Sequence, residues 1–275
     1  MPLVVNTNVA SMNAQRYLTN NTNGLGKTME KLASGFRINR AGDDAAGLQV
    51  SEKLRAQIRG SQKALDNVQD GINLLNIADG AMQSITDAVQ RMRELAVQAA
   101  NDTYSTAQRS AMQTEYDSLA SGITQIAQAA QFNGIHLLDG SAPSEVNLQI
   151  TANQGGNADD LDIKDGLLDI TSVDTAGSLL SHGSAQTAIS TLDDALDDIN
   201  EARGKLGAFT NRLEYTAQNL ATNIENTSAS ESRVRNVDVA MESSNLARNQ
   251  ILQQAASSML AQANQSPQIA LSLLR

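Results

Sequence analysis

Apolar residues recur at alternating intervals of three and four over two long stretches of the chain, the first between residues 54 and 99. This spacing is typical of a helix that packs lengthwise against a partner helix. At 1.5 Å per residue such a helix would be about 68 Å long, so the pattern predicts a rod. Thirteen of its fourteen positions are apolar, Ser61 being the exception: Leu54, Ile58, Ser61, Leu65, Val68, Ile72, Leu75, Ala78, Met82, Ile85, Val89, Met92, Ala96 and Ala99.

Two further helices are expected to pack against this one. Polar residues 101–105 interrupt the first seam, and the helix that follows is expected to fold back antiparallel because the connection is short. Its apolar face contains Met112, Tyr116, Leu119, Ile123, Ile126 and Ala130. The second long seam has apolar residues at all twelve positions: Ala185, Ala188, Leu192, Ala195, Ile199, Ala202, Leu206, Phe209, Leu213, Ala217, Leu220 and Ile224. The fold class is therefore mainly α, a long antiparallel coiled-coil or helical bundle.

The chain between the seams has a different pattern. Val146, Leu148 and Ile150 alternate with polar residues, and Leu161 and Ile163 continue the pattern after a turn at residues 154–157. Such alternation predicts strands. We expect one β-hairpin region, within residues 139–180, and no other sheet. The Asn-Gly pair at 133–134 is read only as a turn.

The two ends carry weaker helical stripes. Leu25, Met29, Leu32 and Phe36 form the N-terminal stripe, and Leu252, Ala255 and Met259 form the C-terminal one. Each is narrow, and an isolated helix needs tertiary packing to persist. We therefore expect the two terminal helices to pair with each other and to be poorly ordered in the free monomer. The expected division is an N-terminal helix in 1–43, a bundle in 44–235 and a C-terminal helix in 236–275.

Composition narrows the function classes. The 275 residues are 41% hydrophobic but only 3% aromatic, with no Trp, which suits small helix–helix seams. The absence of cysteine excludes a disulfide scaffold, a thiolate metal site and a Cys nucleophile. A net charge of −10 argues against nucleic-acid binding. Residues 139–201 hold thirteen acidic residues and one Lys, which we interpret as a solvated segment because no oxygen-ligand loop pattern for a divalent cation occurs there.

Ten short segments near the two ends of the chain carry a family resemblance: 34–39 (SGFRIN), 43–48 (DDAAGL), 50–55 (VSEKLR), 90–98 (QRMRELAVQ), 132–134 (FNG), 206–209 (LGAF), 211–213 (NRL), 251–255 (ILQQA), 260–265 (LAQANQ) and 271–275 (LSLLR). They resemble the corresponding segments of bacterial flagellins, and the resemblance covers residues 1–140 and 185–275. Only about 45 residues separate these halves, so the chain resembles a minimal flagellin without the large variable outer domains.

The resemblance implies a structural subunit that polymerises into the extracellular flagellar filament for swimming motility. It implies secretion in an unfolded state by type III export, followed by ordering of the termini during assembly. Implied partners are other copies of the chain, an export chaperone, the filament cap protein and the hook-junction protein. The residues assigned to polymerisation are Leu25, Met29, Leu32, Phe36, Leu252, Met259, Leu271 and Leu274.

The resemblance also implies recognition by the flagellin-sensing Toll-like receptor of a host. The matching residues are Arg91 and Leu95 in the first long helix and Glu115 in the second. Arg91 and Leu95 are four residues apart and off the a/d seam, so we expect them to share an outward face. The same face is expected to pack against the next subunit of a filament.

The two alternatives to a flagellin are an enzyme and a hook–filament junction protein. The two histidines, His136 and His182, lie outside any H-E-x-x-H arrangement, and no P-loop, G-x-S-x-G or G-x-G-x-x-G motif occurs. We therefore expect no enzymatic activity, no cofactor and no metal. A hook–filament junction protein, which resembles flagellin in its terminal regions, is the second alternative. No run of 18 apolar residues is present, so no membrane insertion is expected.

Overall fold

The computed structural model describes residues 7–140, 147–152, 160–162, 167–170, 175 and 177–273, and it describes no side chains in 160–162 and 266–273. Five helices form in this part of the chain, and they confirm the mainly α prediction. Their bounds are α1 Val9–Ser34, α2 Ala45–Ala99, α3 Thr106–Ala129, α4 His182–Arg235 and α5 Val239–Leu273. The chain divides into two compact units, one of Met1–Ala56 with Asn226–Arg275 and one of Gln57–Glu225.

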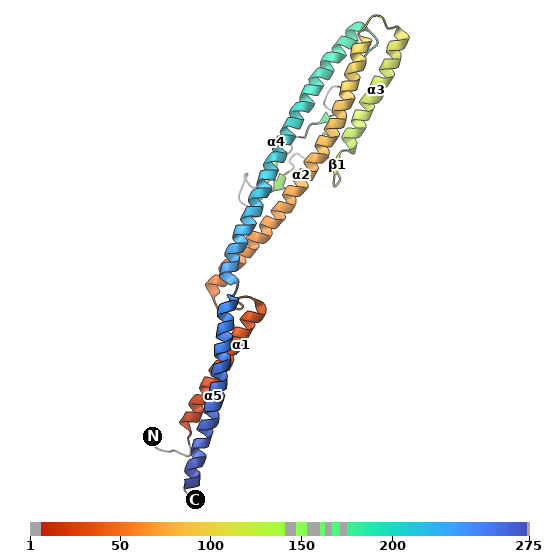
Figure 1. Cartoon of the computed structure of the whole chain (residues 1–275). Coiled ribbons are helices and arrows are strands. Elements are labelled where there is room, and N and C mark those ends of the chain that lie inside the picture. The colour runs from red at the N-terminus through yellow and green to blue at the C-terminus, as the bar shows by residue number, and fades with distance from the viewer. Residues whose placement is uncertain are drawn as a thin grey trace. The chain divides into compact units, whose positions relative to one another are not determined.

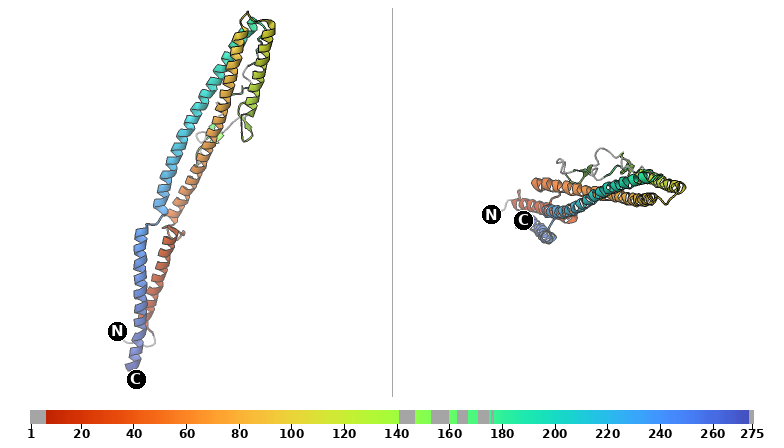
Figure 2. Two further views of the ribbon diagram at one scale, coloured as in Figure 1. Left: turned by 45° about the vertical axis from the view of Figure 1, so that its right-hand side comes forward. Right: turned by 90° about the horizontal axis from the view of Figure 1, so that it is seen from above.

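The second unit is a three-helix bundle of α2, α3 and α4, which lie side by side in Figures 1 and 2. Arg93 pairs with Asp193 and Asp79 with Arg203, so α2 and α4 run antiparallel. The seam positions of α2 from Leu75 to Ala99 are all 0% exposed, as the spacing predicts. The buried positions of α4 are those predicted for the second seam: Ala185, Ala188, Leu192, Ala195, Ile199, Ala202, Leu206, Leu213 and Leu220.

Two short antiparallel sheets lie beside the bundle. In the first, β1 (Gln131–Phe132) pairs with β2 (Ile135–His136); in the second, β3 (Asn147–Gln149) pairs with β4 (Asp160–Asp162). The β3–β4 hairpin confirms the strands predicted around Leu148 and Leu161, whereas Val146, Ile163 and the predicted turn at 154–157 lie outside the described residues. The prediction of a single sheet is wrong, because the Asn-Gly pair closes a second hairpin: Asn133 and Gly134 have φ values of 49° and 81°, which a type I′ turn requires.

The chain around β3 packs closely on α2 because glycines leave room for it. A Cβ placed on Gly60 would lie 2.8 Å from the Ala152 Cβ and 3.2 Å from its carbonyl oxygen. The Asn67 side-chain amide donates a hydrogen bond of 3.1 Å to the carbonyl of Gln149. The hairpin is therefore held on the helices by backbone contacts that a larger residue at position 60 would disturb.

Two side chains of α3, Gln113 and Tyr116, hold the segment before α4. The Gln113 amide donates to the Gly177 carbonyl at 3.1 Å, and its oxygen accepts from the Leu179 amide at 2.6 Å. The Tyr116 hydroxyl donates to the Thr175 carbonyl at 3.0 Å. Leu179 is fully buried as a result, so this segment contributes to the bundle core.

Candidate assembly surfaces

The first unit is built on the antiparallel pair of α1 and α5, whose contact face is largely polar. Asn249 donates to the Thr28 hydroxyl at 3.2 Å, and Asn8 donates to the Ala263 carbonyl at 2.8 Å. Ser11 donates to Asn264 at 2.7 Å. The half-buried or buried positions of α1 include a series with three-four spacing: Ser11, Ala14, Leu18, Asn21, Leu25, Thr28 and Leu32.

This contact face specifies register more than it stabilises. Thr28 is the one buried side chain of α1, and none is buried among the described side chains of α5. Polar residues in a helix–helix seam fix the axial alignment at a cost in stability. A helix pair that buries so little apolar surface needs additional contacts to persist.

The outer faces of α1 and α5 carry most of the exposed large apolar side chains of the described residues. Ile251 and Met259 are each 65% exposed, and Met241 is 66% exposed. Nine of the fourteen large apolar side chains with the highest exposure belong to these two helices. The nine are Val9, Met12, Tyr17, Met29, Val239, Met241, Ile251, Leu252 and Met259.

The predicted C-terminal stripe does not face the other terminus. Leu252 is 43% exposed and Met259 65% exposed, while Gln253, Ala256 and Leu260 occupy the face toward α1. Apolar periodicity does not mark the contact face of α5, because hydrogen-bonding side chains form much of this seam. The side chain of Leu271 and the whole of Leu274 lie outside the described residues.

Of the N-terminal stripe, Leu25, Leu32 and Phe36 are half-buried and Met29 is 49% exposed. The stripe is therefore divided between the contact face and the outer face of α1.

A clasp formed by residues 35–37 and 235–237 joins the chain segments that precede α2 and α5. The Arg37 amide donates to the Arg235 carbonyl at 2.7 Å, and the Val237 amide donates to the Gly35 carbonyl at 3.0 Å. Gly35 has a φ of 75°, which ends α1 in the left-handed conformation that glycine favours.

Charged side chains reinforce the clasp. Arg235 pairs with Glu52 at 2.9 Å and lies over the Phe36 ring. Hydrogen bonds from Arg55 and then Arg235 hold the pKa of Glu52 below its usual value. The apolar stripe that includes Phe36 predicts none of these partners, because local spacing carries no information about residues remote in sequence.

On the bundle, Arg91 connects two helices through its guanidinium. Arg91 pairs with Glu94 at 3.0 Å and with Glu115 of α3 at 2.9 Å, and its side chain is half exposed. Hydrogen bonds to Glu94 and Glu115 raise the pKa of Arg91. The structure thus brings Arg91 and Glu115 together on the surface and adds Glu94 to them.

Leu95, in contrast, does not lie on the outward face that was expected. It is 2% exposed and belongs to the bundle core. The a/d count treats α2 as a helix with one partner, whereas α2 contacts both α3 and α4, which widens its buried face beyond the seam.

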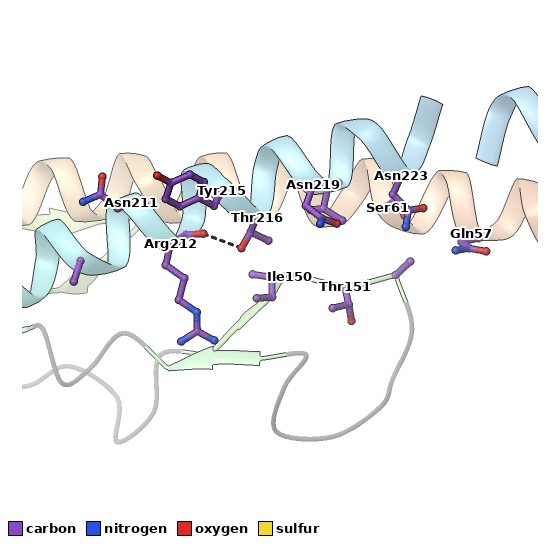
Figure 3. Close-up of a pocket in the computed structure, with 13 residues that line it drawn as sticks. Gln57, Ser61, Ile150, Thr151, Asn211, Arg212, Tyr215, Thr216, Asn219 and Asn223 are labelled. Carbon is purple, nitrogen blue, oxygen red and sulfur yellow. Dashed lines mark hydrogen bonds between the residues drawn. The ribbon is translucent and has the colours of Figure 1, made fainter. Parts of the chain in front are cut away.

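A groove of about 730 Å³ lies in the second unit between α2, α4 and residues 150–152 (Figure 3). Amides such as Gln57, Asn211 and Asn219 line it, with Arg212 as its one cationic group. Its lining contains no carboxylate, and the described part of the chain holds no cluster of three metal-ligating side chains. Within the same residues, each helix lacks the continuous apolar length that would cross a membrane.

Comparison with known protein families gives a match for each end of the chain. Residues 5–142 match the bacterial flagellin N-terminal helical region, and residues 189–274 match the bacterial flagellin C-terminal helical region. The chain belongs to the bacterial flagellins. As such it is a structural subunit of the flagellar filament, which is extracellular, and no observation favours the junction-protein alternative.

Full-length relatives agree with this assignment. The flagellin of Halalkalibacterium halodurans is 46% identical, over 99% of this chain and all of that protein. The flagellar filament 33 kDa core protein of Treponema phagedenis is 44% identical, over 99% of this chain and all of that protein. The flagellin of Bacillus subtilis is 42% identical, with 98% and 99% covered.

Solved structures share the helical architecture. Bacillus cereus flagellin is 32% identical with a TM-score of 0.51, covering 56% of this chain and 88% of that one. A putative flagellar hook-associated protein from Vibrio parahaemolyticus has a TM-score of 0.60, covering 70% of this chain and 100% of that one. Its 14% identity shows a shared fold alone.

Proposed function

We propose that copies of this chain join into the filament through the outer faces of α1 and α5. The observation that supports this is the concentration of exposed apolar side chains on two helices whose described side chains include a single buried one, Thr28. Contiguous exposed apolar surface favours association. In this proposal residues 1–43 and 236–275 form the inner filament core, and residues 44–235 form the bundle outside it.

The small buried surface of the terminal pair also fits secretion before assembly. A segment that buries little apolar surface in the monomer orders only when neighbours supply contacts, which prevents premature polymerisation. We propose that the chain is exported unfolded by the flagellar type III apparatus. Its termini then order at the growing end, under the filament cap and beyond the hook-junction protein.

The export chaperone is proposed to bind α5. Ile251, Leu252 and Met259 are exposed and available to it, whereas Leu246 and Leu260 are half-buried against α1 and become available when α5 separates from α1. A groove-binding chaperone would take the apolar face of a single helix.

A host Toll-like receptor is a second proposed partner, at Arg91 and Glu115. Their half-exposed pair forms a charged, hydrogen-bonding surface on α2 and α3. Leu95 cannot contact a receptor without a change in the bundle, because it is buried.

The assembly proposal is tested by deleting residues 236–275. The truncated protein is expected to remain a soluble helical bundle and to add no subunits to filament seeds in electron micrographs. Filaments built from the truncated protein would contradict the proposal.

A point variant makes the test sharper. Ile251→Ser removes an apolar side chain that is 65% exposed, so the monomer keeps its helix content while seeded elongation slows at least about tenfold. Ile77→Ser is the matched control, because this isoleucine is also exposed, at 41%, but lies on α2. An equal loss in both variants would show that the terminal helices are not the main assembly surface.

A further inference from the structure

The methionines of the described residues fall into two groups by exposure. Met82, Met92 and Met112 are buried in the bundle, at 0%, 0% and 9% exposure. The others all lie on α1 and α5 and are 49–66% exposed. These four are Met12, Met29, Met241 and Met259.

Exposed methionine has two properties that matter on an assembly surface. Its flexible, polarisable thioether adapts to irregular partner surfaces. It is also the apolar side chain that peroxides convert to a polar one, and exposure governs how readily this happens. The same four side chains thus combine a role in packing with a chemical sensitivity.

We propose that Met12, Met29, Met241 and Met259 form a peroxide-sensitive modification site that controls assembly of the free subunit. This inference rests on the proposed assembly through α1 and α5. Hydrogen peroxide transfers one oxygen atom to each thioether: an S–O bond forms, the O–O bond breaks, the sulfur loses two electrons and the peroxide leaves as water. Methionine sulfoxide reductases reverse the change.

The sulfoxide blocks packing because it is a strong acceptor placed on an apolar face. Burying a polar group without a hydrogen-bond donor costs free energy, and the exposed apolar side chains of the same surface, such as Ile251 and Val239, have no donor to offer. Subunits already in a filament have these thioethers covered by their neighbours, so the free monomer is the oxidisable state.

The experiment compares the full chain with a variant in which all four are changed to Leu. Both proteins are treated with hydrogen peroxide as monomers, and sulfoxides are located by peptide mass spectrometry. Seeded elongation of the wild type is expected to fall at least about tenfold and to recover after treatment with methionine sulfoxide reductases A and B. The quadruple variant retains every other methionine and is expected to elongate at the same rate before and after treatment.

Two results would overturn the inference: an equal loss in the oxidised quadruple variant, or a fully oxidised wild type that elongates normally. A second pair of variants covers the case in which four leucines impair assembly by themselves. Met241→Gln with Met259→Gln imitates the polar sulfoxide and is expected to elongate at least about tenfold more slowly than Met241→Leu with Met259→Leu, without any oxidant. Equal rates in this pair would also contradict it.

The deletion of residues 236–275 separates this inference from the assembly proposal. If the truncated chain forms filaments, the assembly surface itself is misplaced. If truncation abolishes assembly while oxidation leaves the wild type active, only the methionine site is wrong.

Discussion

The guanidinium carbon of Arg235 lies 4.6 Å from the centre of the Phe36 ring, so residues 199 positions apart in sequence meet where α1 has just ended and α5 is about to begin. Arg235 also pairs with Glu52 at 2.9 Å, and its side chain is only 15% exposed. The contact combines a cation–π interaction with an ion pair around two backbone hydrogen bonds. It joins the chain segment that follows α1 to the segment that precedes α5.

Removing this guanidinium is expected to open the clasp. Arg235→Gln should speed hydrogen exchange at the Arg37 and Val237 amides, which donate across the clasp, by roughly tenfold. Arg233→Gln is the matched control, since Arg233 is exposed and contacts Ser230 of its own helix. Unchanged exchange in Arg235→Gln, or an equal increase in the control, would show that the clasp does not depend on the stacked side chain.

Replacing Gly60 or Gly80 of α2 with alanine is expected to change the stability of the protein in opposite directions. Alanine at position 60 would press on the Cβ and backbone of Ala152, and overpacking of this kind costs about 1–3 kcal/mol, more than the roughly 1 kcal/mol that helix propensity returns. Nothing lies within 4 Å of a Cβ at position 80, so Gly80→Ala should stabilise by about 0.5–1 kcal/mol. Thermal unfolding followed by circular dichroism measures both, and a stabilising Gly60→Ala would contradict the packing of residue 152 on α2.

Arg91 and Leu95 are expected to act by different routes. Arg91→Ala and Glu115→Ala should leave the melting temperature nearly unchanged, because the pair is half exposed, and should lower the response of a Toll-like receptor reporter about tenfold. Leu95→Ala should destabilise the bundle by about 2–5 kcal/mol, because the side chain is buried in the core. Arg93→Ala, which breaks an ion pair with α4 instead, serves as the control for the reporter. A full response from Arg91→Ala monomers would refute the receptor placement.

The ion pair between Arg93 and Asp193 should make stability depend on pH in one direction. A hydrogen bond from Arg93 lowers the pKa of Asp193 in the folded state. The stabilisation is therefore fully present above the ordinary carboxyl pKa of about 3.9 and is lost as the pH falls through the lower folded value. Asp193→Asn should unfold at a lower urea concentration than the wild type at neutral pH. In strong acid the two proteins should unfold at the same urea concentration.

Asp194→Asn is the control, since the described residues give Asp194 no ion-pair partner. A pH dependence of Asp193→Asn that equals the control would show that the pair contributes nothing.

The spacing of apolar residues determined the bundle. The positions from Leu75 to Ala99 and the matching positions of α4 are buried as predicted. A three-four repeat puts its apolar residues on one face of the helix, and that face packs against the partner helix. The alternation around Leu148 and Leu161 likewise predicted two strands of a hairpin, and in the structure these two residues are paired. Local periodicity carries this information in the residues themselves.

Only the tertiary structure decided which helix faces, beyond the predicted apolar seams, are buried against other helices. Leu95 is buried because α3 and α4 both contact α2, and the Leu252–Met259 stripe is exposed because hydrogen bonds such as Asn249 to Thr28 turn another face of α5 toward α1. The Arg235–Phe36 contact joins segments too distant for any local pattern to pair. Periodicity identifies an apolar stripe on a helix. It does not tell how many other helices will surround that helix, or which hydrogen bonds will join it to a helix remote in sequence, because both arise only when the chain has folded.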